Sequence, residues 1–145
     1  FHREEATALA KIKEDGSIRH RMGDLGRIDE KGRLWFYGRK SQRVRAENGD
    51  LYTLAVEGVF NAHPDVKRTA LVGVGRRPVL CVELEPGTKK TEEILAQELL
   101  ALGARYEHTR PVKVLLFRPS FPVDIRHNAK IAREKLSLWA AQRLA

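Results

Sequence analysis

The apolar residues of this chain fall into short runs whose spacing alternates between strand-like and helix-like. Residues 66–74 and 79–84 are rich in Val, Leu and other residues that suit strands, and the glycine and proline of residues 75–78 separate them, which predicts a β-hairpin. Residues 112–117 form another strand-sized apolar run. We therefore expect a small sheet in the second half of the chain.

Apolar positions at helical spacing predict three helices around these strands. The first covers residues 54–62, with Thr53 in position to cap its N-terminus. The second starts at Thr91, where two glutamates suit the positive end of the helix dipole, and ends before Gly103. The third covers residues 129–144. Because helices and strands alternate, we expect an α+β fold, with α/β as the alternative, in which helices cover a short sheet.

The first part of the chain has a different pattern. Residues 29–32 are turn residues between two apolar runs and predict a β-hairpin over residues 28–38. The next segment is polar and basic and ends in an Asn-Gly turn, as a linker or hinge would. We therefore expect three parts: the end of a preceding domain at residues 1–40, a hinge at residues 41–50 and a second domain at residues 51–145.

Composition narrows the class of protein. Hydrophobic residues make up 42% and charged residues 32% of the 145 residues, and no apolar run reaches the roughly 20 residues that span a bilayer. A single cysteine, Cys81, excludes an internal disulfide and suits a reducing, cytoplasmic location. Because the sequence starts at Phe1 without an initiator methionine, we expect a fragment of a longer protein.

The chain is also basic. The 27 Lys and Arg residues exceed the 19 Asp and Glu residues and give a net charge of +8. Such an excess favours an anionic partner. Nucleic acid, the phosphates of a nucleotide, an acidic membrane surface and an acidic protein all qualify, and composition does not choose among them.

Two stretches before the expected hinge contain candidate ligand-binding residues. Asp24 follows Gly23 in a tight turn, where its carboxylate could accept hydrogen bonds from two ribose hydroxyls, or could bond to its own backbone. Arg39 and Lys40 could hold phosphate or ribose oxygens, or could belong to a solvated basic linker. Taken alone, these residues favour a turn aspartate bonded to its own backbone in the first case and a solvated linker in the second.

Lys130 is the candidate for catalysis. We expect it to open the last helix after the proline-containing loop 121–128, from which its ammonium could enter a neighbouring active site. A lysine is slightly unfavourable in the first turn of a helix, which is a small argument for a functional role; a plain surface lysine is the alternative. The five histidines, including His127, are scattered without paired helical spacing, so we expect no metal site.

The order of these stretches resembles a known family. Residues 22–40 read MGDLGRIDEKGRLWFYGRK, an Ala-His-Pro-x-Val segment follows at residues 62–66, and a proline followed by Lys-Ile-x-Arg completes the set at residues 122–133. This order is similar to the C-terminal part of the acyl-adenylate-forming enzymes, the superfamily of acyl-CoA synthetases, firefly luciferase and peptide-synthetase adenylation domains. The similarity extends from about Ile18 to Leu138.

The resemblance implies a role for each candidate residue. Asp24 would bind the ribose hydroxyls of ATP, and Arg39 would contact its ribose or phosphates. Lys40 and Ser41 would lie at the hinge of a mobile lid. Lys130 would bridge the substrate carboxylate and the α-phosphate during adenylation. The large N-terminal domain that precedes the hinge would be the main partner and would supply most contacts to Mg²⁺.

Three departures from the family pattern resemble one of its branches. Ser41 replaces the usual Asp or Lys of the hinge, Asn48 replaces a common glycine, and Asn-Ala-Lys at residues 128–130 replaces Ser-Gly-Lys. These features are similar to the β-lactone synthetases of bacterial olefin biosynthesis, which need no CoA. The resemblance implies adenylation of a 2-alkyl-3-hydroxy fatty acid, followed by attack of its own hydroxyl, with His127 or Asp124 as candidates for assisting that hydroxyl.

The implied partners are the large domain, the hydroxy fatty acid and further enzymes of the pathway, with no nucleic acid and no membrane span. A fatty acyl-CoA or acyl-AMP ligase is the alternative within the superfamily, and a basic nucleic-acid-binding module is the alternative outside it. Trp35, Phe36 and Tyr37 are adjacent, so they alternate faces and do not form the aromatic platform of an RNA-binding sheet. We expect the fragment alone to have no ligase activity.

Overall fold

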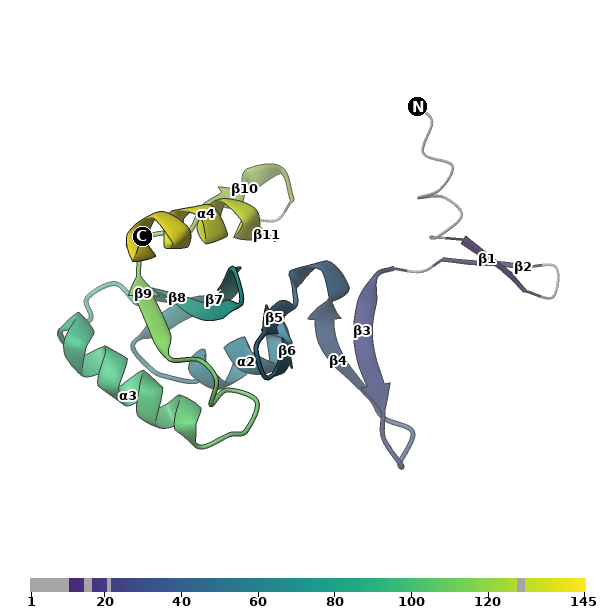
Figure 1. The fold of residues 1–145 in the computed structure, drawn as a ribbon, viewed down its shortest axis with the longest axis horizontal. Helices are drawn as coiled ribbons and strands as arrows, with labels where there is room; N and C mark the ends of the chain where they lie inside the picture. The colour runs from purple at the N-terminus through teal and green to yellow at the C-terminus, as the bar shows by residue number, and fades with distance from the viewer. Residues whose placement is uncertain (1–10, 15–16, 21, 128–129) are drawn as a thin grey trace.

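The computed structural model describes residues 11–14, 17–20, 22–127 and 130–145 (Figure 1). The strands are β1 Lys11–Glu14, β2 Ser17–His20, β3 Asp24–Ile28, β4 Leu34–Arg39, β5 Val44–Ala46, β6 Gly49–Leu51, β7 Val66–Val74, β8 Arg77–Leu84, β9 Val114–Phe117, β10 Val123–Asp124 and β11 Lys130–Ile131. The helices are α2 Thr53–Phe60, α3 Glu92–Ala104 and α4 Arg133–Leu144, with short 3-10 helices at Lys40–Gln42 and Ile125–His127.

The centre of the fold is a three-stranded sheet in the order β7-β8-β9. β7 and β8 form the predicted hairpin, with Leu71 opposite Leu80. Its turn is shorter than predicted because Gly75, at φ +60°, allows β8 to start at Arg77. β9 pairs with β8 in parallel, and α3 makes the connection between them. The mixed sheet with its helices confirms the α+β prediction.

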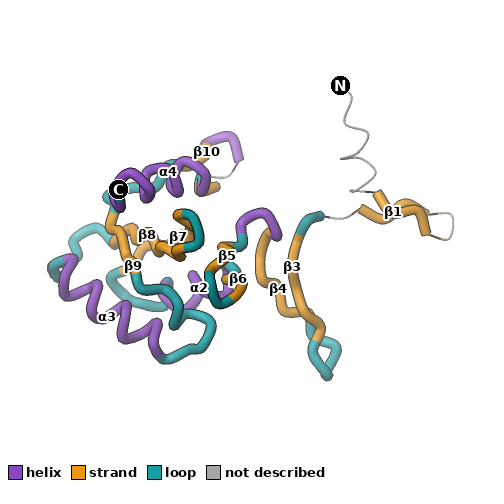
Figure 2. The backbone as a smooth tube through the Cα atoms, in the orientation of Figure 1, coloured by secondary structure: helices purple, strands orange, loops and turns teal. Residues whose placement is uncertain are grey.

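Alternation along the central strands gives the sheet two apolar faces, and helices lie on both sides of it (Figure 2). One face packs against α2 and α3, and its buried residues include Leu71, Leu80, Phe60 and Leu99. The other face packs against α4, and its buried residues include Val72, Cys81, Leu136 and Ala140. Burial raises the pKa of the Cys81 thiol to about 12, so this cysteine acts as an apolar filler. None of the described helices is long and apolar enough to cross a membrane.

Two predicted helix ends are wrong because packing overrides the local signal. Thr53 does not cap α2, since it is buried inside the first turn and the residue before it makes no side-chain cap. Gly103 does not end α3. Its missing side chain lets the helix approach Phe60, whose Cζ would lie 2.8 Å from an added Cβ. The predicted start of α3 at Thr91 is confirmed, and Thr91 also caps the helix by accepting a 3.4 Å hydrogen bond from the Ile94 N–H.

Much of the predicted hinge, residues 41–50, packs against the sheet instead of crossing solvent. β5 and β6 form a hairpin there, and Val44, Ala46 and Leu51 are buried in the cluster that contains α2 and β7. The short 3-10 helix before β5 has no buried residue. The assignment of residues 41–50 as the hinge region, with Lys40 and Ser41 as its hinge residues, stays a prediction.

β3 and β4 form the predicted hairpin, which lies to one side of the central sheet (Figure 1). At its turn, the indole N–H of Trp35 donates a 2.9 Å hydrogen bond to Asp29. Together with bonds from Arg33 and Lys31, this contact lowers the pKa of the Asp29 carboxyl to about 2. The strands of this hairpin expose large apolar side chains, namely Ile28, Leu34, Trp35 and Phe36.

Candidate active site

Lys130 lies on a β-hairpin, and the prediction that it opens a helix is wrong. β10 and β11 pair antiparallel with Asp124 opposite Lys130. The Ala132 N–H donates a 2.8 Å hydrogen bond to the Pro122 carbonyl and extends this ladder by one more contact. Because these backbone groups bond across the hairpin, they cannot form a first helical turn, and α4 starts only after them. The Lys130 side chain is exposed.

Asp124 and His127, the candidates for assisting the substrate hydroxyl, lie on the same hairpin. The Asp124 carboxylate accepts a 3.0 Å hydrogen bond from the Arg126 N–H. His127 ends the 3-10 helix that follows β10, and the structure describes its backbone alone. Residues 128 and 129, with the helix start predicted there, lie outside the described residues. The structure thus brings Asp124 and Lys130 together as strand partners.

A buried carboxylate holds the beginning of this loop. Glu83, near the end of β8, is 1% exposed and accepts a 2.8 Å hydrogen bond from the Phe121 N–H. Lys67 and Arg68 each donate to the same carboxylate at 2.9 Å. Burial disfavours the charged form of Glu83, but these hydrogen bonds outweigh it and lower the pKa of the carboxyl. Glu83 therefore stays ionised and fixes the chain just before β10.

A second buried carboxylate holds the end of the loop. The Arg133 guanidinium donates to both oxygens of Glu57, with Nη2 2.9 Å from Oε2. The Leu71 N–H donates to Glu57 Oε1 at 2.7 Å, and the Leu71 carbonyl accepts from Arg133 Nη1 at 3.2 Å. The side chains of Arg133 and Glu57 are 17% and 7% exposed. This pair joins the first residue of α4 to the edge of β7 and to α2.

Asp24 and Arg39 meet on the β3–β4 hairpin, where they are strand partners. Arg39 Nε lies 3.1 Å from Asp24 Oδ1, and the guanidinium also donates to the Met22 carbonyl. The Lys40 N–H donates a 2.8 Å hydrogen bond to the Gly23 carbonyl and continues the pairing. Both side chains of the ion pair are exposed, so a carboxylate and a guanidinium face solvent side by side.

An open hollow of about 550 Å³ lies beside this ion pair. Its lining residues are Met22, Gly23, Arg39, Lys40, Ser41, Arg43 and Arg45. The charged groups of this lining are all cationic, which suits an anionic ligand such as phosphate. The β3–β4 and β10–β11 hairpins lie well apart in Figure 1, so the structure groups Asp24, Arg39, Lys40 and Ser41 but does not bring Lys130 to them.

A larger hollow of about 1000 Å³ lies elsewhere, where the β7–β8 turn, the start of β9 and the end of α4 meet. Its lining includes the basic residues Arg76, Arg77, Arg110 and Lys113. Asn48, on the turn between β5 and β6, also lies on its wall. None of the residues predicted to bind nucleotide or to catalyse lines this hollow, so it is distinct from the candidate active site.

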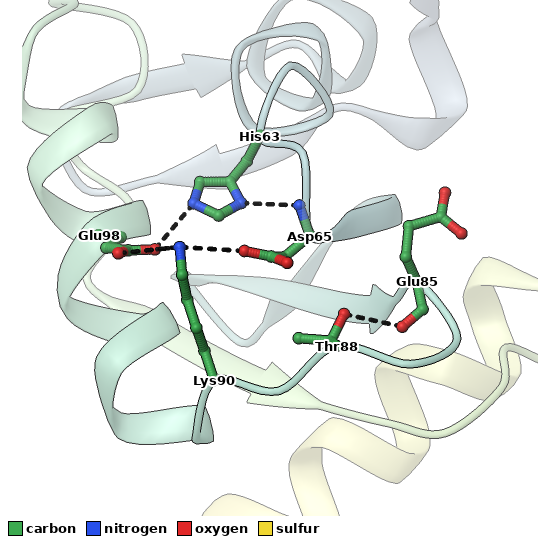
Figure 3. Close-up of polar contacts among 6 residues, drawn as sticks. All are labelled: His63, Asp65, Glu85, Thr88, Lys90 and Glu98. Carbon is green, nitrogen blue, oxygen red and sulfur yellow. Dashed lines mark hydrogen bonds and ion pairs between the residues drawn. The ribbon is translucent and has the colours of Figure 1, made fainter.

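A charged cluster joins the end of α2 to α3 (Figure 3). His63 Nδ1 accepts from the Asp65 N–H at 3.2 Å, so Nε2 carries the proton and donates to Glu98 at 3.0 Å. The Lys90 ammonium lies 3.1 Å from Asp65 and 2.8 Å from Glu98. These carboxylates raise the pKa of Lys90, and its ammonium is the main cause of the lowered pKa of Glu98. His63, Asp65 and Glu98 are grouped closely enough to hold a metal ion, but the Lys90 ammonium already bridges the two carboxylates.

The fold matches solved structures of enzymes that activate acids. It superposes with a TM-score of 0.73 on an amide bond synthetase from Marinactinospora thermotolerans, which is 28% identical and is matched over 93% of this chain and 27% of that one. An ATP-bound RpMatB-BxBclM chimera is 26% identical, with a TM-score of 0.75 and coverage of 94% and 27%. This chain therefore has the fold of a part of the adenylate-forming enzymes.

Two curated relatives show which adenylate-forming enzymes this chain is similar to over nearly its whole sequence. The olefin β-lactone synthetase of Xanthomonas campestris is 55% identical over 98% of this chain, and that of Stenotrophomonas maltophilia is 53% identical over 99%. The chain spans 27% and 28% of the lengths of these two relatives. No family model matches the chain. The resemblance found in the sequence is confirmed, since the chain is homologous to part of the olefin β-lactone synthetases; the nucleic-acid-binding alternative is not favoured.

Sequence reasoning missed Glu57, Glu83 and Arg133. A signal for the first two is present, because each is a charged residue inside a run of apolar ones. Such a residue is buried only when it is paired. The partners could not be read from the sequence, since Arg133 is 76 residues from Glu57 and Phe121 is 38 residues from Glu83.

Proposed function

We propose that this chain is the lid of an ATP-dependent adenylate-forming ligase and that the full enzyme is a β-lactone synthetase. Its substrate would be a 2-alkyl-3-hydroxy fatty acid, and its products a β-lactone, AMP and pyrophosphate. The observation that carries this proposal is the exposed Lys130 on a hairpin held at both ends by buried carboxylates. The 53–55% identity to olefin β-lactone synthetases supports the particular substrate class.

In this proposal residues 1–40 end the large domain, residues 41–50 contain the hinge and residues 51–145 form the lid. The exposed apolar side chains of the β3–β4 hairpin support the first assignment, because they suit contact with a larger body of protein. Rotation about the hinge, at Lys40 and Ser41, would carry the Lys130 hairpin toward the nucleotide-binding residues, Asp24 and Arg39.

Adenylation joins two anions, which is the difficulty that Lys130 would relieve. A substrate carboxylate oxygen attacks the α-phosphorus of ATP, a phosphorus–oxygen bond forms, and pyrophosphate leaves with the electron pair of the broken bond. The Lys130 ammonium would lie between the carboxylate and the α-phosphate and offset their repulsion, most strongly where water is excluded. Asp24 would accept hydrogen bonds from the ribose hydroxyls, and Arg39 would donate to ribose or phosphate oxygens.

Lactone closure would follow without a second substrate. The 3-hydroxyl oxygen attacks the acyl carbon, a ring carbon–oxygen bond forms, and AMP leaves with the electrons of the acyl–phosphate bond. The hydroxyl proton passes to a base, for which Asp124 and His127 are the candidates. Because nucleophile and acyl group belong to one molecule, closure benefits from a high effective concentration.

Mg²⁺ would neutralise phosphate charge in such a reaction. The acidic grouping of His63, Asp65 and Glu98 does not fit this role, because Lys90 bridges its carboxylates and none of its residues lies on the Lys130 hairpin. The large domain would therefore hold the ion, and none of the steps assigned to this chain's residues depends on it.

The test gives the full-length enzyme ATP, Mg²⁺ and a 2-alkyl-3-hydroxy fatty acid without CoA, and measures product mass. A product equal to the substrate minus one water, with AMP released, supports lactone formation. An acyl-adenylate that accumulates until CoA is added would make the enzyme an acyl-CoA ligase and overturn the lactone assignment. The 145-residue chain alone is the control and should give no turnover.

A further inference from the structure

We infer that Glu57 and Arg133 are positioning residues for Lys130, acting by fixing the hairpin that carries it. The inference rests on the proposed function, because it assigns the pair to the same adenylation step. The structural basis is a largely buried, two-pronged ion pair that joins α2 to Arg133, the first residue of α4 and the second after β11.

The pair occupies the outer edge of β7 in the way that a neighbouring strand would. Leu71 gives its N–H to Glu57 and its carbonyl to Arg133, so both of its outward backbone groups are bonded. Two other side chains bond the same edge, since Asn61 accepts from the Thr69 N–H and Ser137 donates to the Gly73 carbonyl. The start of α4 is therefore attached to the backbone of β7 through the Arg133 guanidinium and its carboxylate partner, Glu57.

The attachment is transmitted to Lys130 over a short, bonded segment. Arg133 is three residues from Lys130, and the intervening Ala132 donates its N–H to Pro122. Ile131 is the strand partner of Val123. A shift of the Arg133 backbone would therefore displace strand β11 and, with it, the backbone from which the Lys130 side chain extends.

Stability alone is a weak reason for such a pair. Burying two charges costs solvation free energy that their attraction need not exceed, and a well-packed apolar pair is often as stable. What an ion pair with four fixed contacts supplies is a defined geometry, as a planar guanidinium bonds a carboxylate in one orientation. A catalytic ammonium needs that precision, because a displacement of about 1 Å can cost about 100-fold in rate.

The first experiment uses Arg133→Lys in the full-length enzyme. This substitution keeps the positive charge but loses the two-pronged contact with Glu57. We expect pyrophosphate release to slow by about 10- to 100-fold, with the KM for ATP changed by less than about twofold. Consumption of a supplied acyl-adenylate should stay within about twofold of the unsubstituted enzyme, because Lys130 serves the adenylation step.

The second experiment asks whether Arg133 acts through Lys130. Adding Arg133→Lys to Lys130→Ala should lower the residual rate of pyrophosphate release no further, since the group being positioned is already gone. Glu57→Gln provides a second variant, because its amide oxygen still accepts the Leu71 N–H while the charge is removed. Ser137→Ala is the matched control: it removes a 2.6 Å contact between α4 and the same strand and should leave both half-reactions unchanged.

The outcomes separate this inference from the proposed function. If Lys130→Ala leaves pyrophosphate release unchanged, the catalytic role that the proposed function gives to Lys130 is wrong, and there is nothing for the pair to position. If Lys130→Ala removes that activity but Arg133→Lys and Glu57→Gln slow both half-reactions equally, or add their losses to that of Lys130→Ala, the pair is merely structural and the positioning role is overturned. Selective, non-additive loss in the first half-reaction supports it.

Discussion

The backbone N–H of Phe121 donates a 2.8 Å hydrogen bond to the carboxylate of Glu83, although 38 residues separate the two in the sequence. The contact brings the loop that leads to Lys130 onto the end of the central strand β8. Lys67 and Arg68 complete the bonding of the carboxylate, and the Arg68 guanidinium also lies over the Phe121 ring, 5.3 Å from its centroid. One buried acid thus organises a strand end, two basic side chains and a loop.

Glu83→Gln tests this role through stability and its pH dependence. The substitution keeps an oxygen for the Phe121 N–H but loses the charge that Lys67 and Arg68 bond, so we expect the free energy of unfolding at pH 7 to fall by about 2 kcal/mol. The folded state lowers the pKa of Glu83 below its ordinary value of 4.5, so the stability it adds is present above about pH 4.5 and is lost as pH falls through the lower, folded value.

Urea unfolding of the 145-residue chain across this pH range measures both effects. The stabilities of the two proteins should converge as the pH falls below 4.5, because protonated glutamate and glutamine are then equivalent in charge. A difference that stays constant from pH 7 to the acid limit would show that the ionised carboxylate is not the source of the stabilisation.

Two helical glycines should respond in opposite directions to replacement by alanine. A Cβ at Gly103 would lie 2.8 Å from the buried ring of Phe60, so Gly103→Ala should destabilise the chain by about 1–3 kcal/mol. Gly58, in α2, is exposed and has nothing within 4 Å of an added Cβ. Gly58→Ala should stabilise the chain by about 0.5–1 kcal/mol, through the better helix propensity of alanine.

Thermal unfolding of the two variants decides this point. Equal effects of the same sign would mean that close approach to Phe60 is not why glycine occupies position 103. The comparison is matched, since both substitutions add one methyl group to a helix interior.

Sequence patterns were sufficient where the signal is local. The β7–β8 hairpin and the start of α3 at Thr91 depend on residues close together in the chain, and the structure confirms them. Thr53 and Gly103 carry equally good local signals for a helix start and a helix stop, yet both predictions are wrong. Thr53 is buried within the first turn of α2, and Gly103 lies inside α3, where it packs against Phe60. Local preference is a weak constraint where packing acts against it.

The candidate active site likewise combines features that local sequence predicts with features that depend on distant segments. Asp24 and Arg39 belong to the hairpin whose turn the sequence predicts, but that turn alone would place Asp24 opposite Gly38. A register shift between Leu25 and Gly26 brings it opposite Arg39 instead. Lys130 is a candidate from its place after the proline-containing loop, and the family resemblance gives it a role. Its hairpin could not be predicted, because β10 and β11 contain two residues each. Strands that short have no periodicity to detect. Their anchors, Glu57 and Glu83, become visible only when distant segments are folded together.

Lys130→Ala should remove adenylation while leaving the fold intact. An ammonium placed where charge must be stabilised is worth about 3 kcal/mol, so we expect pyrophosphate release by the full-length enzyme to fall by about 100- to 1000-fold. Because the side chain is exposed, the thermal unfolding midpoint should not change. Lys135→Ala, at an exposed position in the first turn of α4, is the control and should keep nearly full activity. Near-normal release by Lys130→Ala would contradict the assignment.

Asp24→Asn should weaken nucleotide binding more than it weakens the fold. The carboxylate lies 3.1 Å from the Arg39 guanidinium on an exposed hairpin, so its loss removes a charged acceptor for ribose and disturbs the neighbouring donor. Hydrogen bonds to charged groups contribute about 1.5–3 kcal/mol, which corresponds to a rise of about 10- to 100-fold in the KM for ATP. Asp50→Asn is a matched control, because Asp50 makes a 3.1 Å ion pair with Arg43 on the next hairpin. If both variants raise the KM for ATP equally, general loss of negative charge accounts for the effect, and Asp24 has no particular role in binding the ribose.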